Sequence, residues 1–391
     1  MTEMKGSQTA PWSAGPKKSS SGDEGAASAP GATSAGTTRM DSKTPAPPTG
    51  TAARETPSTE AASSVLVGKG LDLGTANIVA AMRDGEGLRI TRERNAFLDV
   101  QGDVFSKSML TKLGVPYVVH EGKFIVLGEP AFELANIFGR ETRRPMSGGL
   151  ISPAEVDAAP MMRLLISKAL GQPSVPEEPV YFSVPAESID RDNNVMYHKG
   201  LFEGMLRKMG YKPTPIGEGH AVVFSELAER DFTGVGLSFG GGMVNVCVSY
   251  KTIPALAFSI ARAGDWVDKN AAEVLGMPRS RATYLKERGM DVRTPRGRDE
   301  EAIAIYYRNL ITYVLENLRA RFENADGMPT LDEPVDLVCS GGTAMVGGFA
   351  EVFREEINRM KLPFPIGNVR LATEPLYTVA KGCLVAAAIS E

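Results

Sequence analysis

GLSFGGGMVN, residues 236–245, contains three consecutive glycines between two segments that read as β-strands. Glycine takes positive φ without strain and lets the backbone come close to a ligand. Turns of this kind can present backbone N–H groups to phosphate oxygens, and an acidic side chain beside them commonly handles a metal ion. Here Ser238 stands where such an acid could be. The stretch therefore predicts a phosphate-binding hairpin that lacks a carboxylate.

The same pattern occurs earlier in the chain. GLDLGTANIV, residues 70–79, shares with residues 236–245 the order Gly-Leu-x-apolar-Gly, followed by small residues and a second strand. Each copy heads a similar run of predicted strands and helices, and the spacing between the copies is about one domain. We therefore predict two related halves whose glycine hairpins face each other across a cleft.

The first 64 residues differ in composition from the rest of the chain. Residues 1–64 contain no Val, Ile, Leu, Phe or Tyr and are mainly Ala, Gly, Ser, Thr and Pro. Such a segment cannot bury enough apolar surface to offset the entropy of ordering, so we predict a disordered tail. It is either a spacer or a docking segment for a protein partner around Trp12, and the spacer is the simpler interpretation.

Charge and cysteine usage limit the possible partners and the compartment. The formal net charge of the chain is −4, and acids and bases balance in residues 1–64, so no nucleic acid is expected as a partner. Cys247, Cys339 and Cys383 lie in apolar stretches without CxxC spacing, which indicates reduced core thiols and a cytoplasmic protein. No apolar run is long enough for a transmembrane helix, so direct membrane insertion is not expected.

Strand and helix patterns alternate from Val65 onward, which is typical of an α/β fold. Apolar residues at helical spacing form one stripe in residues 300–323, the clearest helix. We predict a strand-turn-strand unit in residues 65–83 and a β-hairpin in residues 115–128 that turns at 120–122. Further strands are predicted at residues 179–186 and 335–340. Further helices are predicted at residues 160–170, 192–209, 220–230, 349–360 and 374–390.

Asp72 stands in a run that otherwise reads as a buried strand, where a carboxylate is costly without a partner. It could hold Mg²⁺ through water beside the phosphates of a nucleotide. It could equally end the strand by accepting hydrogen bonds from the turn amides of Gly74 and Thr75. Both interpretations remain open from this residue alone.

Two further positions allow a functional and a plain structural interpretation. Residues 340–343, Ser-Gly-Gly-Thr, follow a strand and precede a helix, where a ligand could approach or where an ordinary helix could start. Glu218 precedes a predicted helix and could position a water molecule, or simply match the helix dipole. His220 is more readily a helix cap or core residue than a base.

The motifs in this order resemble the actin superfamily, and most closely the bacterial actin-like proteins of the MreB and MamK type. The resemblance covers residues 65–391 approximately. It rests on seven ordered stretches: GLDLGTAN (70–77), YFSVPAES (181–188), GEGHAVVFSELA (217–228), GVGLSFGGGMVNVCVS (234–249), RAGDWVD (262–268), CSGGTAMVGGFAEVF (339–353) and EPLYTVAKGCLVAA (374–387).

This resemblance implies an actin-like, ribonuclease H-like fold of two domains with a nucleotide cleft between related halves. Domain I would comprise residues 65–233 and 373–391, with a small insertion at about 98–140. Domain II would comprise residues 234–372, with a small insertion at about 276–332.

The resemblance also implies a role for individual residues. Asp72 would bind the Mg²⁺ of Mg-ATP, and Glu218 would orient the attacking water, so these two are the candidate catalytic residues. Phosphates of ATP or ADP would be held by Gly74, Thr75, Asn77, Gly240, Gly241 and Gly242. The nucleoside would be contacted by Lys286, Glu287, Gly264 at the ribose, and Gly341, Gly342 and Met345 at the adenine.

Ser238 departs from the family pattern, which usually has Asp at this position. Serine can donate or accept a hydrogen bond but adds no charge. Phosphoryl transfer depends on charge stabilisation around the metal, so hydrolysis should be slow or absent while nucleotide binding is retained. Residues 243–245 also lack the Thr or acid that is common there in the family.

Three functions are compatible with these features. The leading hypothesis is a cytoskeletal ATPase that self-associates into filaments. The alternative is a non-polymerising nucleotide-binding scaffold or regulator, which the Ser238 departure favours. A small-molecule kinase of the same superfamily is less favoured, because no stretch resembles a dedicated substrate-binding insertion.

Overall fold

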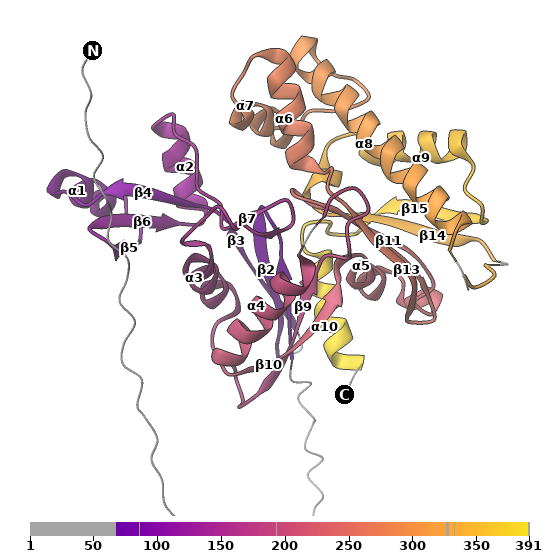
Figure 1. Cartoon of the computed structure of the whole chain (residues 1–391), viewed down its shortest axis with the longest axis horizontal. Coiled ribbons are helices and arrows are strands. Elements are labelled where there is room, and N and C mark those ends of the chain that lie inside the picture. Colours follow the sequence, from indigo (N-terminus) through magenta and orange to yellow (C-terminus); the bar gives the residue numbers. More distant parts are fainter. Residues whose placement is uncertain (1–67, 86, 193, 326–327, 332, 390–391) are drawn as a thin grey trace, which may run out of the picture. The chain divides into compact units, whose positions relative to one another are not determined.

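The computed structural model describes residues 68–85, 87–192, 194–325, 328–331 and 333–389 (Figure 1). The predicted disordered tail, residues 1–64, and its docking stretch around Trp12 lie outside the described residues.

Two five-stranded sheets form the framework of the described chain. The first sheet has the order β3 (Gly87–Arg94), β2 (Asn77–Asp84), β1 (Lys69–Leu73), β9 (Glu178–Val184), β10 (Tyr211–Gly217). The second sheet has the order β13 (Ile253–Ile260), β12 (Val244–Tyr250), β11 (Gly234–Phe239), β14 (Val335–Ser340), β15 (Ile366–Leu371).

The two sheets have the same topology. In each, the first three strands pair antiparallel as a meander, and two later strands add in parallel on the other side of the first strand. The strands that carry the repeated Gly-Leu-x-apolar-Gly pattern, β1 and β11, occupy the same central position. The prediction of two related halves is therefore confirmed.

A helix packs closely on each of these central strands because a glycine leaves room for it. A Cβ atom on Gly70 of β1 would lie 2.1 Å from the carbonyl oxygen of Ala380 in α10 (Thr378–Ile389). A Cβ on Gly236 of β11 would lie 2.2 Å from the carbonyl oxygen of Gly219 in α5 (Glu218–Glu226). The two helices lie side by side between the sheets (Figure 1).

The contact between α5 and α10 is also a backbone contact. A Cβ on Gly382 would lie only 1.8 Å from the carbonyl oxygen of Ala221. The backbones therefore touch with no side chain between them. This contact joins the two halves, because α10 packs on β1 of the first sheet and α5 packs on β11 of the second.

Each half has its own apolar core. In the first half, α3 (Ala158–Leu170) and α4 (Val195–Lys208) bury their apolar faces against the sheet. In the second half, the core is formed with α6 (Gly264–Leu275), α8 (Gly297–Glu323) and α9 (Phe349–Met360). The predicted stripe of α8 is confirmed, since it is buried from Ile303 to Leu318, with Phe322 partly buried.

The segment predicted as the first insertion folds as a small unit with its own core. It contains β4 (Phe97–Gln101), α1 (Val104–Lys112), β5 (Tyr117–His120), β6 (Lys123–Leu127) and α2 (Glu129–Ile137). The three strands form a separate sheet, and the predicted turn at residues 120–122 has positive φ at Glu121 and Gly122.

The segment predicted as the second insertion, residues 276–332, contains α7 (Arg279–Glu287) and α8. Since α8 is part of the main core of the second half, the exact domain and insertion boundaries stay predictions.

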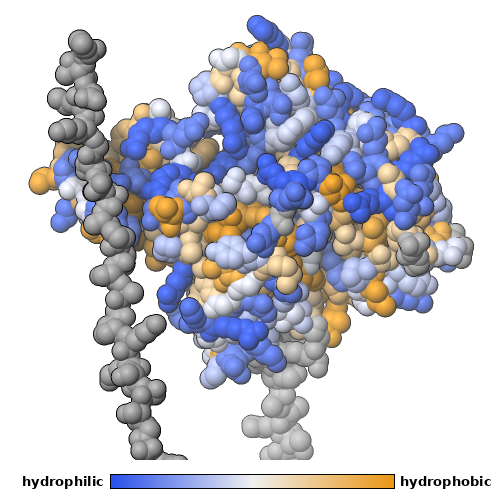
Figure 2. Space-filling view, in the orientation of Figure 1, coloured by the Kyte–Doolittle hydropathy of each residue, from blue (hydrophilic) through white to orange (hydrophobic). Residues whose placement is uncertain are grey.

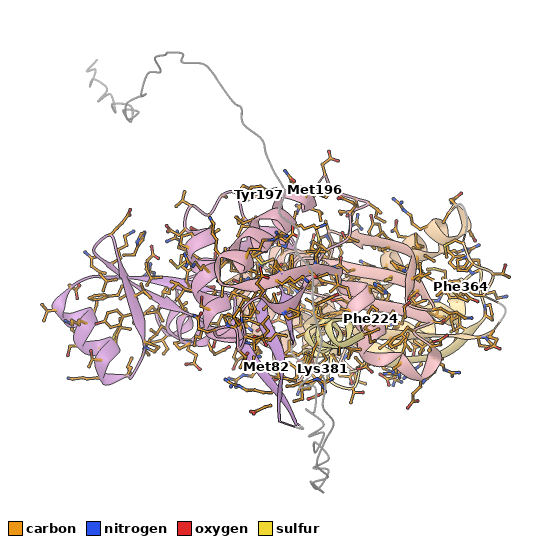
Figure 3. All side chains as sticks on the ribbon, turned by 90° about the horizontal axis from the view of Figure 1, so that it is seen from below. Met82, Met196, Tyr197, Phe224, Phe364 and Lys381 are labelled. Atoms are coloured by element: carbon orange, nitrogen blue, oxygen red, sulfur yellow. The ribbon has the colours of Figure 1, made fainter. Side chains whose placement is uncertain are left out.

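Buried and exposed side chains follow the expected pattern. Cys247, Cys339 and Cys383 are buried free thiols. Hydrophilic side chains cover most of the face in Figure 2, with apolar residues scattered among them. Met196 and Tyr197 project outward at the start of α4 (Figure 3). Among the described helices, none has the length and apolar character needed to cross a membrane.

Candidate functional site

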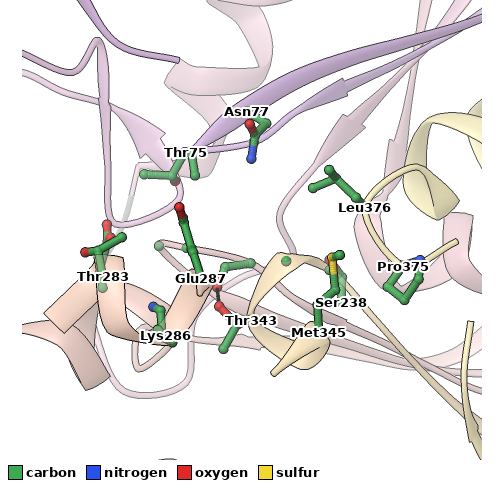
Figure 4. A pocket seen from close by; sticks show the side chains of 18 of the residues that line it. Thr75, Asn77, Ser238, Thr283, Lys286, Glu287, Thr343, Met345, Pro375 and Leu376 are labelled. Carbon is green, nitrogen blue, oxygen red and sulfur yellow. Dashed lines mark hydrogen bonds between the residues drawn. The ribbon is translucent and has the colours of Figure 1, made fainter. Parts of the chain in front are cut away.

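Both glycine turns line one cavity of about 480 Å³ (Figure 4). The candidate residues predicted from the sequence come from distant parts of the chain, yet most of them lie around this space. Those that line it are Asp72, Gly74, Thr75, Asn77, Glu218, Ser238, Gly240, Gly241, Gly242, Lys286, Glu287, Gly341, Gly342 and Met345.

The two glycine turns face each other at contact distance. A Cβ on Gly241 would lie 3.4 Å from the Cβ of Ala76, and a Cβ on Gly242 would lie 2.5 Å from Thr75 Oγ1. Glycine at position 242 is thus required by the close approach of Thr75 and, nearer still, of the backbone nitrogen of Gly149, which would lie 2.2 Å from the Cβ. Both turns line the cavity, although the N–H of Gly240 already donates a hydrogen bond to the carbonyl oxygen of Met243.

A short hairpin, β7 (Met146–Ser147) and β8 (Leu150–Ile151), packs against both turns. The backbone N–H of Gly149 donates a hydrogen bond to Thr75 Oγ1 over 3.0 Å. The same turn packs against Gly242 and Met243 of the second half. The hairpin therefore links the two glycine turns at one end of the cavity.

Asp72 lies at the end of β1, and protein surrounds its carboxylate except on the cavity side. Ser183 Oγ donates a hydrogen bond to Asp72 Oδ1 over 2.9 Å, and Leu73 N–H donates to Ser183 Oγ over 2.8 Å. Burial raises the pKa of Asp72 to about 6, although the Ser183 bond opposes the rise.

Glu218, the first residue of α5, is the second acid at this place. Burial and the negative charge of Asp72 raise the pKa of Glu218 to about 8, while the hydrogen bond from Ser238 opposes the rise. Two acids whose charges disfavour each other are a setting that a cation stabilises, since an opposite charge favours the ionised form.

The donor set fits a particular kind of metal binding. No group of three or more His, Cys, Asp or Glu within the described residues could hold a metal ion by itself. Nucleotide-bound Mg²⁺ needs less, because it usually keeps several waters and uses one or two carboxylates with the phosphates. Asp72 and Glu218 therefore suit Mg²⁺ that arrives with a nucleotide.

Ser238 occupies the position in β11 that Asp72 occupies in β1, two residues after the repeated glycine. Its hydroxyl donates a hydrogen bond to Glu218 Oε2 over 3.2 Å, and it is 3% exposed. The duplicated fold thus places an acid on one side of the cavity and a neutral hydroxyl at the matching place on the other.

Lys286 and Glu287 lie at the end of α7, on another wall of the cavity. Lys286 Nζ lies 2.7 Å from Asp268 Oδ1, and Arg94 Nη2 lies 3.4 Å from Glu287 Oε1. Gly264 is not among the described residues that line the cavity. It lies behind this wall, where its carbonyl oxygen accepts a hydrogen bond from Lys286 Nζ over 3.3 Å.

The sequence did not predict several charged residues of the cavity, which include Arg94, Arg144, Asp265 and Asp268, whereas Thr343 belongs to the turn at residues 340–343 that the sequence singled out. Thr343 Oγ1 donates to the carbonyl oxygen of Gly240 over 2.8 Å and so ties the Ser-Gly-Gly-Thr turn to the glycine hairpin. Asp265 and Asp268 belong to the stretch RAGDWVD, residues 262–268, and its two acids were the sequence feature that could have indicated them as cavity residues. Arg94 and Arg144 stand in no recognisable motif.

Comparisons with known proteins agree with this architecture. The structure titled "MamK double helical filament" matches with a TM-score of 0.64 and 20% identity, over 82% of this chain and 98% of that chain. MreB 5 of Spiroplasma citri bound to AMPPNP matches with a TM-score of 0.58 and 16% identity, over 81% of this chain and 94% of that chain. Its ADP-bound form matches with a TM-score of 0.57 and 16% identity, over the same shares.

At these identities the similarity shows the fold, which is that of the bacterial actin-like proteins. No curated protein sequence matches the chain. A family model described as Volactin matches residues 67–387. Because this match spans more than half of the chain, the chain belongs to the Volactin family.

Proposed function

We propose that this protein binds Mg-ATP and ADP in the cavity between its two halves and assembles into filaments in a nucleotide-dependent way. The observation that carries the proposal is the meeting of both repeated glycine turns with Asp72 and Glu218 in one cavity. The structures titled as MamK filaments, and MreB 5 bound to AMPPNP or ADP, support it as relatives of the same fold.

The residues of the cavity have distinct parts in this proposal. The glycine turns, Thr75 and Asn77 hold the phosphates. Asp72 holds Mg²⁺ through water, and the metal neutralises phosphate charge. Lys286 and Glu287 contact the nucleoside. Met345, which is 53% exposed, contacts the adenine base. Asn77 Oδ1 is buried and has no hydrogen-bond partner, so it is free to bind a water of the metal.

Hydrolysis is slow in this proposal because position 238 provides no charge. Glu218 can orient a water by accepting a hydrogen bond, but its carboxylate already accepts one from Ser238. An acid at position 238 would add a third carboxylate, next to Asp72 and Glu218, beside the metal and the water. Removing one well-placed polar group from such a site typically costs about 10²- to 10³-fold in rate.

A pelleting assay tests the proposal. The full chain is incubated with Mg-ATP, centrifuged and assayed for released phosphate, next to a Ser238→Asp variant. We expect nucleotide-dependent pelleting with little phosphate release from the wild type, and release at least about tenfold faster from the variant. Equal pelleting with and without nucleotide would contradict the proposed nucleotide dependence of assembly. Equal phosphate release by the wild type and the variant would contradict the proposed role of Ser238.

The neutral hydroxyl at position 238 also favours a second function, a nucleotide-binding scaffold that does not polymerise. A scaffold would need the cavity to bind nucleotide but would not need turnover. Clear binding of ATP without any pelleting over a range of salt and protein concentrations would decide for this alternative.

We also propose that the protein works in the cytoplasm. The three buried free thiols support this location, because cysteines persist unpaired in reducing compartments. The sequence composition supports a separate role for residues 1–64, as a spacer or a site for a protein partner.

A further inference from the structure

Arg144 places a positive charge at the end of the cavity where the two glycine turns meet. It lines the cavity and directly precedes Pro145 and the β7–β8 hairpin, which is fixed against both turns. Its Nη1 lies 3.0 Å from Asp265 Oδ1. Since Arg144 belongs to the first half and Asp265 to the second, this ion pair bridges the two halves.

Asp265 in turn lies against the glycine turn of the second half. Its backbone N–H donates a 2.7 Å hydrogen bond to the carbonyl oxygen of Gly241. A Cβ on Gly241 would lie 3.9 Å from Asp265 Oδ1. The guanidinium of Arg144 is therefore next to the turn that would hold phosphates.

The carboxylate of Asp265 has a second guanidinium partner. Arg279 Nη2 lies 2.8 Å from the same oxygen, Oδ1. Burial opposes ionisation of Asp265, but Arg144 and Arg279 lower its pKa below the usual value. Asp265 would thus keep a charged partner if Arg144 moved away, so the movement would not leave an unpaired buried carboxylate.

The other basic residues that line the cavity are bound differently. Lys286 is paired with the buried Asp268, Arg94 with Glu287, and Arg92 with Glu129. Their acids have no second basic partner among the ion pairs of the described residues. Arg144 alone among these four cavity residues shares its acid with another base.

Arg144 also has space around it. A second cavity of about 270 Å³ adjoins the first, and Arg144 lines both. Its side chain is 26% exposed. A guanidinium with open space on two sides can turn from one partner to another without repacking the core.

We propose that Arg144 is a binding residue that gives up its ion pair with Asp265 and binds the terminal phosphate of a triphosphate, so that the cavity distinguishes ATP from ADP. This inference rests on the proposed nucleotide binding. Arginine is suited to the task, because its planar fork binds phosphate with two hydrogen bonds and stays charged. This change of partner also breaks the Arg144–Asp265 ion pair between the two halves, and it does so only when a triphosphate is bound.

The test compares equilibrium binding of Mg-ATP and Mg-ADP by displacement of a fluorescent nucleotide, which needs no turnover. Arg144→Gln should weaken binding of ATP by roughly 10- to 100-fold and change binding of ADP less than about threefold, as expected for a lost charge-assisted bond. Arg279→Gln is the matched variant on the same carboxylate: it leaves Asp265 without its second guanidinium, so Arg144 is released less easily. ATP binding should therefore weaken relative to ADP, but by less than in Arg144→Gln, which removes the phosphate-binding group itself.

Thermal unfolding of both variants shows whether each is folded, and Arg144→Lys, which keeps the charge, should recover part of the preference for ATP. Equal weakening of ATP and ADP by Arg144→Gln would mean that Arg144 only bridges the halves and would overturn the inference. A wild type that binds neither nucleotide would overturn the proposed function, and this inference with it.

Discussion

At the scale of single residues, the buried His198 is held in its neutral form by its surroundings. Its Nδ1 accepts a 3.1 Å hydrogen bond from the N–H of Ile151, and its ring packs edge-on against Phe202. Burial lowers the pKa of His198 to about 4. The Ile151 bond connects this histidine to the hairpin that packs on the glycine turns.

His198 should therefore make the fold sensitive to acid. A folded-state pKa below the unfolded value means that the unfolded chain binds more protons, so stability is lost as pH falls from about 6.5 towards 4. The full loss is about 3 kcal/mol. His198→Gln keeps an acceptor for Ile151 N–H but does not titrate. Urea unfolding of both proteins at pH 7 and pH 4.5 should show the advantage of the wild type shrinking, whereas a constant difference would contradict this role.

At the scale of elements, glycines decide how closely helices approach strands and each other. Gly382→Ala should destabilise the fold by about 3 kcal/mol, because the new Cβ would meet the carbonyl oxygen of Ala221 at 1.8 Å and backbone would have to move. The free energy of unfolding in urea measures the change. The helix-interior Gly200 of α4 provides the contrast.

A Cβ on Gly200 would meet no atom within 4 Å, and its φ is not positive. Gly200→Ala should thus stabilise the protein by about 0.5–1 kcal/mol through helix propensity. If both alanine variants change stability in the same direction, the close contact of α5 and α10 is not what requires glycine at position 382.

Edge strands explain some of what the sequence could not predict. β10 contains Pro213 and Pro215, which argue against a strand, and β13 contains Pro254. Both strands lie at an edge of their sheet, where a missing N–H does not break the ladder on the open side. α7 was also not predicted, since its sequence RSRATYLKE is polar and carries little apolar periodicity.

At the scale of the whole molecule, the sequence predicted the two-half architecture because the repeat carries it. Gly70 and Gly236 lie in equivalent strands, β1 and β11, and the buried stripe of α8 follows helical spacing. The cavity was predicted through its glycine turns and acids. Arg144 could not be predicted, because its position depends on a fold that brings residues 144 and 265 together and no local pattern records that contact.

The described core also predicts how a shortened chain should behave. The buried apolar residues run from Leu71 to Ala387. Deleting residues 1–64 should leave the thermal unfolding midpoint within about 2 °C of the wild type. In a protein of this size, a change of about 1 kcal/mol in the free energy of unfolding shifts the midpoint by at most about 2–4 °C. Differential scanning fluorimetry measures the midpoint. A larger drop would show that the first 64 residues contribute to the fold, contrary to the prediction from composition.

The side-chain-free contact between Gly382 and Ala221 has a mechanical consequence. Two backbones in direct contact cannot slide far past each other. A change in the angle between the two sheets would therefore be a rotation about this contact. The ion pairs of Arg94 with Glu287 and of Arg144 with Asp265 connect the same two halves away from that point. A change in that angle would therefore alter the distances within these two ion pairs while leaving the contact of α5 and α10 in place.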